Sequence, residues 1–297
     1  MAAAFLLTGI AAGASGGVSR EDIPLFTKAS AMRDSLSDKM ENIFPEGEDE
    51  ALSVARALTF GDKSGLSKTL KEDYRKSGAS HLLALSGLHV GVMYALVSLI
   101  LSVLGNSRPM KVLRTIISLC ILWIYAIITG LGNSISRAAI MITVYQLSDF
   151  AGSKRSLPHS LALSALLITL FRPAAPFEIG FQLSYAAMLS ICYIYPIIKK
   201  ILDCRSLSMR YVWNMLSMSI ACQIGTSPFT LVYFGYFPKY FMLTNLLAIP
   251  LTSAIIYLVP VSAAMASVPE LEGAISTVLA SAINLLNAIL KTIASLN

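Results

Sequence analysis

The stretch His81-Leu-Leu-Ala-Leu-Ser-Gly-Leu-His89 opens an apolar run that continues to Gly105. This run has about the 20 residues that a membrane-spanning helix needs. Polar and titratable side chains are costly in hydrocarbon unless they face protein or water. Ser86 and His89 are three residues apart and would share one face of a helix. We therefore expect this face to line the inside of a helical bundle or a hydrated cavity.

The composition extends this expectation to the whole chain. Of its 297 residues, 55% are hydrophobic and 13% are charged, against about 25% charged in soluble domains. The mean hydropathy is +0.67. The net charge of +6 is uneven, because residues 20–76 carry ten Lys and Arg against twelve Asp and Glu, and residues 77–297 carry thirteen against five. The predicted fold is all-α: a polytopic helical membrane bundle with broken or re-entrant helices and a helical amino-terminal cap.

Three segments differ in character. Residues 1–19 include a short apolar run with no basic residue before it, which favours a short membrane helix or its remnant. In residues 20–79, Met32, Leu36 and Met40 recur at helical spacing among charged residues, so we expect an amphipathic helical cap outside the membrane. Residues 80–297 form the predicted polytopic membrane domain.

Apolar runs follow one another in this last segment. Seven of them cover residues 81–105, 112–131, 134–150, 157–172, 177–198, 212–234 and 239–266, and an eighth, amphipathic run covers 274–294. The runs 134–150 and 157–172 are short for a span, which predicts broken or re-entrant helices buried in protein. Pro228, Pro250 and Pro260 are candidates for helix kinks, because proline removes an intrahelical hydrogen bond.

The loops between the runs alternate in charge. Those at 106–114, 151–157 and 199–210 hold three, two and four basic residues, whereas the intervening loops hold one each. The positive-inside rule places the three basic loops in the cytoplasm. If seven spans follow residue 80, residues 20–76 and the carboxyl end then lie outside.

Several of the later runs carry polar residues at helical spacing. These stripes consist of Glu178, Gln182 and Tyr185; of Ser219, Gln223, Thr226 and Thr230; and of Asn245 and Thr252. Such side chains serve as interhelical hydrogen-bonding groups or line a hydrated cavity. The segment from Asn133 to Arg137 could present donors to a phosphate at a helix start. Arg137 could equally bond backbone carbonyls at the membrane edge.

The residue pattern gives little support to catalysis. A Ser86 and His89 nucleophilic pair lacks an aspartate positioned in sequence to orient the histidine, and it lacks the second glycine of a nucleophile elbow. The three histidines and four cysteines show no metal-ligand spacing. We therefore expect no enzymatic activity, no metal site and no cofactor.

A family resemblance rests on five ordered motifs. They are Gly61-Asp-Lys-Ser-Gly-Leu66 with Ser80-His-Leu-Leu-Ala-Leu-Ser-Gly-Leu-His-Val90; Ser136-Arg-Ala-Ala-Ile-Met141; Gly180-Phe-Gln-Leu-Ser-Tyr185; Ser227-Pro228 through Phe234-Gly235; and Thr244-Asn-Leu-Leu-Ala-Ile-Pro-Leu251. Together they span about residues 50–266, and they resemble the motifs of the ComEC-type competence proteins. The resemblance concerns the competence membrane domain alone.

The resemblance implies a multi-pass channel in the bacterial cell (inner) membrane that admits one strand of external DNA during transformation. It implies single-stranded DNA, the lipid bilayer and other competence proteins (a DNA receptor, a nuclease, a cytoplasmic motor) as partners, with a homo-oligomer possible. Family members usually add an OB-fold and a metallo-β-lactamase-like domain. Residues 20–49 are too short and too helical for an OB barrel, and no His-x-His-x-Asp-His motif is present, so nuclease activity is not carried over.

A DNA path needs hydrated donors for phosphates and planar groups for bases. The candidates for such a path are His81, Ser86, Gly87, His89, Asn133, Arg137, Gln182, Ser184, Tyr185, Gln223 and Asn245. Two alternatives remain: a non-transporting membrane scaffold descended from such channels, and a small-solute carrier. A carrier is expected to show internal repeats, and none is evident.

Overall fold

The computed structural model describes residues 24–296, apart from 42, 45–46, 84, 106, 151–155, 203–204, 236–238 and 266–268. The predicted hydrophobic segment 1–19 lies outside the described residues. All regular elements of the described chain are helices, so the predicted all-α class is confirmed. The helices are α2 (Pro24–Glu41), α3 (Asp49–Phe60), α4 (Lys68–Lys76), α5 (Ser80–Leu83), α6 (Gly87–Leu101), α7 (Arg108–Ile128), α8 (Asn133–Phe150), α9 (Leu157–Phe171), α10 (Ile179–Tyr193), α11 (Tyr195–Lys199), α12 (Leu207–Phe234), α13 (Phe241–Met265) and α14 (Pro269–Ser295), with 3₁₀ turns η2 (Ser102–Leu104) and η3 (Ala175–Phe177).

Within the described chain, six helical segments are long and apolar enough to cross a membrane. They are Gly87–Leu104, Arg108–Ile128, Ile179–Lys199, Leu207–Phe234, Phe241–Ala263 and Gly273–Ser295. The number and the membership differ from the seven expected spans. The polar residues of α8, including Asn133 and Arg137, lower its hydropathy, and α9 has only 15 residues. Conversely, α14 qualifies as a span although its sequence looked amphipathic.

Large apolar side chains cover much of the outer surface of these helices. Leu99 and Ile100 on α6 and Ile116 and Ile124 on α7 are all more than half exposed. An exposed apolar surface of this extent is unfavourable in water and indicates contact with lipid. The chain is accordingly a multi-pass membrane protein.

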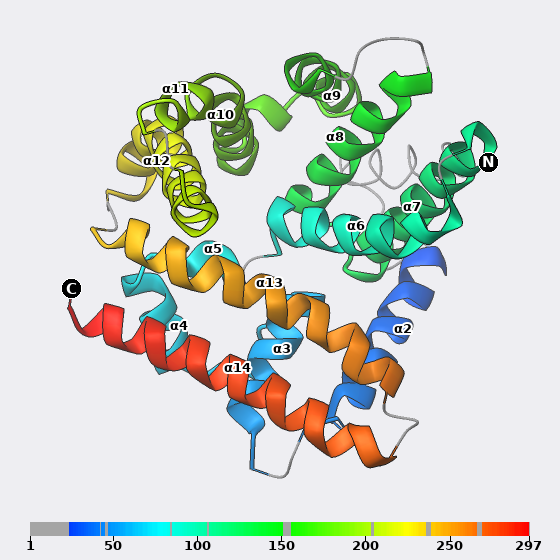
Figure 1. Ribbon diagram of the computed structural model, residues 1–297, viewed down its shortest axis with the longest axis vertical. Helices are drawn as coiled ribbons and strands as arrows, with labels where there is room; N and C mark the ends of the chain where they lie inside the picture. The colour runs from blue at the N-terminus through cyan, green and yellow to red at the C-terminus, as the bar shows by residue number, and fades with distance from the viewer. Residues whose placement is uncertain are drawn as a thin grey trace.

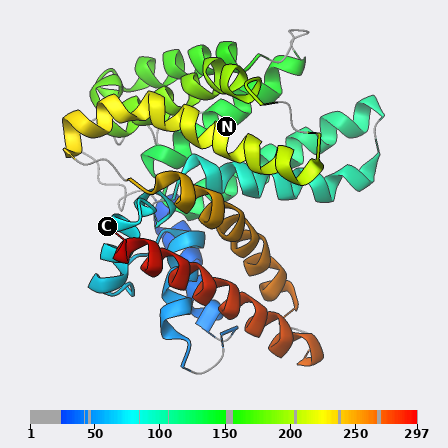
Figure 2. The ribbon, with the colours of Figure 1, turned by 60° about the vertical axis from the view of Figure 1, so that its left-hand side comes forward.

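The helices form two groups, which Figure 2 shows one above the other. The upper group consists of α6 to α12, and the lower group consists of α2 to α5 with α13 and α14. Helix α13 joins the groups, because it contacts α14 and α3 as well as α6 and α12. A hydrogen bond from Tyr125 Oη in α7 to the carbonyl oxygen of Thr59 in α3, at 3.0 Å, adds a second link.

Five helices form a closed ring of contacts. Helix α6 contacts α8, α8 contacts α10, α10 contacts α12, α12 contacts α13, and α13 returns to α6. In Figure 1, α6, α8, α10 and α12 lie above α13, which crosses the middle of the picture. Four of the five are candidate spans, and the fifth, α8, carries Arg137. Helices α7 and α14 lie outside the ring.

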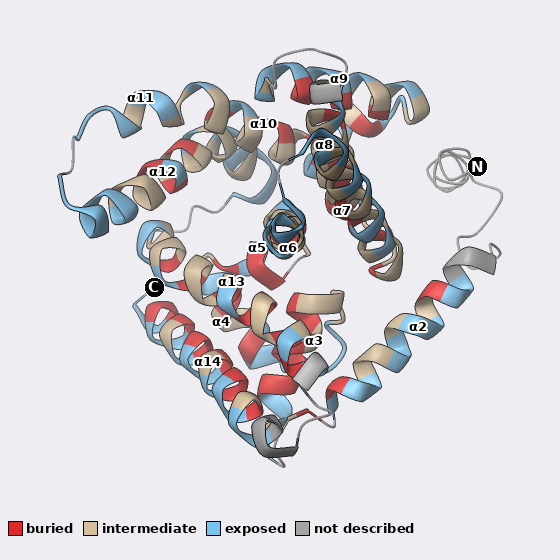
Figure 3. Cartoon of the chain, turned by 45° about the vertical axis from the view of Figure 1, so that its right-hand side comes forward, coloured by how far each residue is buried: buried red, intermediate tan, exposed pale blue. Residues whose placement is uncertain are grey.

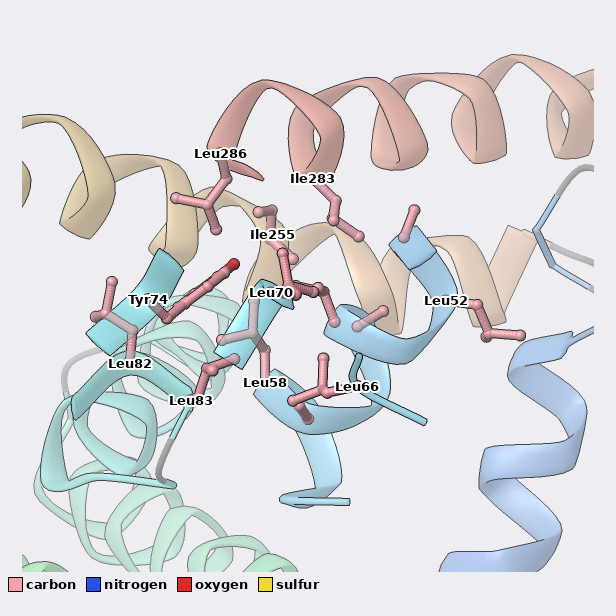
Figure 4. Close-up of a cluster of buried hydrophobic side chains, with 14 of the residues drawn as sticks. Leu52, Leu58, Leu66, Leu70, Tyr74, Leu82, Leu83, Ile255, Ile283 and Leu286 are labelled. Carbon is pink, nitrogen blue, oxygen red and sulfur yellow. The ribbon is translucent and has the colours of Figure 1, made fainter. Parts of the chain in front are cut away.

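The lower group has the largest apolar core (Figure 4). Leu58 of α3, Tyr74 of α4, Leu82 of α5, Ile255 of α13 and Ile283 of α14 are almost completely buried in it. Figure 3 shows that buried residues concentrate in α3 and along one side of α14. The amphipathic pattern of the amino-terminal segment thus produces helices whose apolar faces pack on α13 and α14.

Three hydrogen bonds connect polar groups of the helices around this core. Tyr74 Oη donates to Asn287 Oδ1 at 3.0 Å, and Asn287 Nδ2 donates to Glu50 Oε1 at 3.2 Å. Thr244 Oγ1 donates to the carbonyl oxygen of Ser77 at 2.6 Å. Since a buried polar group without a partner is costly, these bonds fix α4 against α13 and α14.

The prolines of the membrane helices differ in whether the helix continues through them. The three predicted kink residues lie inside α12 and α13, and both helices continue through them. At Pro228 the carbonyl of Ile224, which loses its usual N–H donor, accepts a bond from Ser227 Oγ at 3.2 Å. An interruption does occur at Ile194, between α10 and α11, two residues before Pro196. Proline at the start of a helix is favourable because its missing N–H is not needed there.

Candidate functional site

A small cavity of mixed polar and apolar lining lies where α8 and α10 begin and α9 ends. Its volume is about 40 Å³, and one water molecule needs roughly 10–15 Å³ by this measure. It is lined by Leu131, Asn133, Ser136, Arg137, Ile140, Ile168, Arg172, Ala175, Glu178 and Phe181. The space suits a few waters or one small polyatomic ion.

Arg137 is the most deeply buried charge at this cavity. Its side chain leaves α8 and is 6% exposed. Its Nε and Nη2 groups both donate to Ser184 Oγ in α10, at 3.2 and 2.9 Å. A Cβ added at Gly180 would lie 3.4 Å from Arg137 Nη2, so the glycine leaves room for the guanidinium. Among the described residues, no carboxylate lies within ion-pair distance of Arg137.

Three further side chains form a closed cluster at the cavity. Arg172 pairs with Glu178 through Nη2 and Oε1, and its Nη1 donates to Asn133 Oδ1 at 3.0 Å. Asn133 Nδ2 in turn donates to Glu178 Oε2 at 3.2 Å. Asn133 is exposed, whereas Arg172 and Glu178 are half-buried. The cluster therefore stands between solvent and the buried Arg137, and the two arginines and one glutamate leave one positive charge.

Two helix amino termini meet at the same place. Helix α8 begins at Asn133, and α10 begins directly after Glu178, whose side chain makes no capping hydrogen bond. The free amides at a helix start carry about half a positive charge, which favours anions. The arginines and the helix termini therefore act in the same direction, and the cavity is electropositive.

Gln182 and Tyr185, from the predicted stripe on α10, are partnered within the bundle. Gln182 Nε2 donates to the carbonyl oxygen of Pro176 at 3.1 Å, and its Oε1 accepts from Tyr233 Oη at 2.9 Å. Tyr185 stacks on Phe181 with ring centroids 4.1 Å apart, and its hydroxyl is 3.0 Å from Ser164 Oγ. Both faces of α10 thus contribute to packing between α9, α10 and α12.

The opening stretch forms the start of α6. Ser86 caps the helix by accepting from the amide of Leu88 at 3.2 Å, and His89 Nδ1 lies 3.3 Å from the amide of Ser86 and 3.0 Å from its Oγ. His89 is completely buried, and its Nε2 has no partner among the described residues. A Cβ at Gly87 would lie 3.5 Å from that of Ala138 in α8. His81 is exposed, with Nδ1 3.1 Å from the carbonyl oxygen of Gly78.

The structure brings some of the predicted residues together and separates others. Asn133, Arg137 and Ser184 meet at the α8–α10 junction. Ser86, Gly87 and His89 approach α8 but do not line the cavity there. Gln223 is half-buried on α12, and Asn245 lies on α13 with a buried Oδ1 that lacks a partner in the described chain. The candidates therefore do not form one constriction around the Arg137 cavity.

Sequence reasoning missed two residues that matter here. Arg172 completes the cluster with Glu178, and the six-residue separation across a proline-containing turn was the available signal. Gly225 permits the α10–α12 crossing, because a Cβ there would lie 1.8 Å from Ser190 Oγ and 2.8 Å from the carbonyl oxygen of Ala186. Pairs of small residues four apart, Ala186 with Ser190 and Ala221 with Gly225, mark such close crossings in membranes.

No metal-binding group emerges in the part of the chain that the structure describes. There, no cluster of three or more His, Cys, Asp or Glu side chains could hold a metal ion. The polar groups that line the α8–α10 cavity are two arginines, an amide, a hydroxyl and the Glu178 carboxylate.

Comparison with known proteins identifies the family. Residues 58–297 match the family described as Competence protein. The chain is also 30% identical over 201 residues to ComE operon protein 3 of Bacillus subtilis (strain 168), a match that covers 68% of this chain and 25% of the relative. The chain thus spans about a quarter of that relative's length, and no solved structure matches. With its motifs in order and its helical membrane domain, the chain belongs to the ComEC-type competence protein family.

Proposed function

We propose that this chain is a channel subunit of the bacterial inner membrane that passes single-stranded DNA during natural transformation. Membership of the competence family supports a role in DNA uptake. The observation that carries the channel role is the closed ring of α6, α8, α10, α12 and α13. In this proposal the DNA strand passes through the ring.

The ring suits a polyanion that must move. A single strand is held through its phosphates by basic groups, and the binding weakens as salt rises. Few basic residues stand within the ring helices, and Arg137 is the buried one among those described. A sparse set of donors retains the strand weakly and lets it advance, whereas a continuous basic groove would arrest it.

The positive-inside assignment gives this channel a direction. The basic loops at 106–114, 151–157 and 199–210 face the cytoplasm in this proposal, and α2 to α4 form a cap outside the bilayer. This orientation requires α8 and α9 to cross the bilayer as a pair, in addition to the candidate spans. The α8–α10 junction then lies on the outer side, where DNA arrives from a receptor or nuclease, and a motor acts from the cytoplasm. The chain itself conducts and does not catalyse.

A scaffold role is the second candidate. It is favoured by one observation: Gln182, Ser184 and Tyr185 all have partners within the bundle. In that case the polar stripes hold helices together, and no path is required.

Uptake of labelled DNA separates the two candidates. A transformable host lacking its own homologue is complemented with this chain, and labelled DNA that becomes nuclease-resistant inside cells is measured. A channel restores uptake, and His89→Ala and Gln182→Ala lower it at normal membrane level, while the exposed Arg210→Gln does not. Restored uptake that neither variant lowers contradicts a path along these residues, and absent uptake at normal protein level favours the scaffold.

Topology has an independent test. A cysteine placed at Leu207, in a chain whose four native cysteines are replaced, is expected to resist a membrane-impermeant maleimide in intact cells and to react after permeabilisation. Efficient labelling of intact cells would reverse the orientation and place the α8–α10 junction in the cytoplasm.

A further inference from the structure

The α8–α10 cavity has features of a built binding site for an anion. Arg137 has a guanidinium with five N–H donors, and its bonds within the described chain go to one hydroxyl, Ser184 Oγ, from Nε and Nη2. Nη1 has no hydrogen-bond partner among the described residues, although Arg137 is 94% buried and lines the cavity. A buried charge without a counter-ion is costly, so an anion in the cavity would satisfy Arg137.

The helix termini strengthen this requirement. The first amides of α8 and of α10 have no intrahelical partners, and both helices begin at the cavity. Helix amino termini bind phosphate and carboxylate groups through these amides. The buried arginine and the two helix starts are separate features, and both favour a negative charge near the cavity.

The size of the cavity restricts the ligand. A volume of about 40 Å³ holds roughly three waters, so one phosphate group fits and a nucleobase does not. Contacts to phosphate alone position a strand without reading its sequence. The site therefore suits a DNA backbone of any sequence.

Glu178 gives the site a competing anion of its own. Its carboxylate already engages Arg172 and accepts from Asn133. This cluster is partly exposed, and partly exposed ion pairs are weak. A phosphate, which arginine can bind through two parallel hydrogen bonds, can therefore replace the carboxylate on Arg172, and the carboxylate recovers its place when the phosphate leaves.

We infer that the cavity beside Arg137 binds one phosphate group of a DNA backbone at a time, and that Glu178 competes for Arg172 and so keeps this binding weak and reversible. The inference rests on the proposed function, because the DNA is taken from it. The site takes a phosphate group as its ligand, and its source, a strand or free phosphate, is separated by experiment.

The test measures binding by the full chain purified in detergent. The probes are a fluorescent oligothymidine with phosphodiester linkages, the same oligomer with uncharged methylphosphonate linkages, and inorganic phosphate. We expect wild-type protein to bind the phosphodiester strand alone among the oligomers. Arg137→Gln is expected to weaken that binding about tenfold, the usual effect of losing a charge-assisted hydrogen bond, and to reduce the salt slope by about 0.7, one phosphate on a single strand.

A misfolded variant would lose binding, so a second variant is chosen that should bind the strand more tightly than wild type. Glu178→Gln keeps the side chain's size and removes the competing charge, so we expect about threefold tighter binding, in line with a weak ion pair. Arg210→Gln, which removes an exposed arginine at the start of α12, is the matched control and is expected to bind like wild type.

Each outcome has a distinct meaning. Tighter binding by Glu178→Gln together with weaker binding by Arg137→Gln supports the site. Equal binding by wild type and both variants overturns it, even if the chain restores DNA uptake in cells. Free phosphate that binds as tightly as the strand overturns the DNA backbone as ligand. A chain that shows the expected binding but fails to restore uptake leaves the site in place and contradicts the channel.

Discussion

The lower helix group and the α8–α10 junction differ in how their buried polar groups are partnered. In the lower group, the buried Tyr74 and Asn287 start a chain of hydrogen bonds that ends at the exposed Glu50. At the junction, Arg137 is buried against one hydroxyl with no carboxylate at ion-pair distance in the described chain. The first arrangement stabilises a fold, whereas the second leaves a buried charge for which we propose a phosphate ligand. Four substitutions test this contrast, from the largest expected effect to the smallest.

Gly225→Val should have the largest effect, because it blocks the close crossing of α12 on α10, one of the two helices of the junction. The new Cβ would lie 2.8 Å from a backbone carbonyl of α10, which cannot move aside as a side chain can. We expect loss of most folded protein, measured by monodispersity in detergent. Gly91→Ala, where a Cβ would meet nothing within 4 Å, is the control, and a monodisperse Gly225→Val protein would mean that α10 and α12 can separate without loss of fold.

Leu58→Ala tests the apolar core of the lower group. Leu58 is completely buried, and removing such a side chain usually costs about 2–5 kcal/mol. We expect a clearly lower thermal midpoint in detergent. The exposed Leu99→Ala on α6 is the matched control. Equal midpoints for Leu58→Ala and wild type would show that α3 does not depend on this core.

Tyr74→Phe tests the hydrogen-bond chain without altering the packing. Burial raises the pKa of the Tyr74 hydroxyl well above its ordinary value, so it stays neutral and donates to Asn287 across the working pH range. Its loss leaves the Asn287 oxygen without that donor, and we expect a cost of about 1–3 kcal/mol. The midpoint shift should be the same at pH 6 and pH 9, and a shift found at one pH alone would point to another titrating group.

Arg172→Gln should have the smallest effect on stability. The ion pair with Glu178 is partly exposed, and such pairs contribute about 0–1 kcal/mol. We therefore expect a nearly unchanged thermal midpoint together with weaker binding of oligothymidine. A loss of stability as large as that of Leu58→Ala would show that the junction is structural, and the contrast between the two regions would disappear.

Much of the architecture follows from local sequence pattern. Apolar runs of about 20 residues predict spans, and the helical spacing in residues 20–79 predicts helices that the structure confirms as α2 to α4. It was harder to predict which helices are spans. A few polar residues lower the hydropathy of α8, which is not a candidate span, and a few polar residues made α14 look amphipathic although it is one. The interruption at Ile194 was also missed, although Pro196 was visible in the sequence.

The candidate site was predictable only in part. Arg137 and Asn133 lie at the start of an apolar run. Polar side chains are rare in such runs because placing them in hydrocarbon costs free energy, so they can be recognised as candidates from the sequence. Arg172 and Gly225 carry no comparable signal, since an arginine at a loop and a glycine in a membrane helix are both ordinary. Their importance depends on what faces them from α8 and from α10.

The sequence alone therefore establishes an all-helical membrane protein of the competence family, because hydropathy and helical period depend on near neighbours in the chain. The pairing of helices across the molecule depends on which surfaces fit together, and this is decided by contacts between distant residues. Tyr74 and Asn287 are 213 positions apart, and Arg137 and Ser184 are 47 apart. That separation is why the closed ring, the stabilising core and the unsatisfied arginine emerge only once the chain is folded.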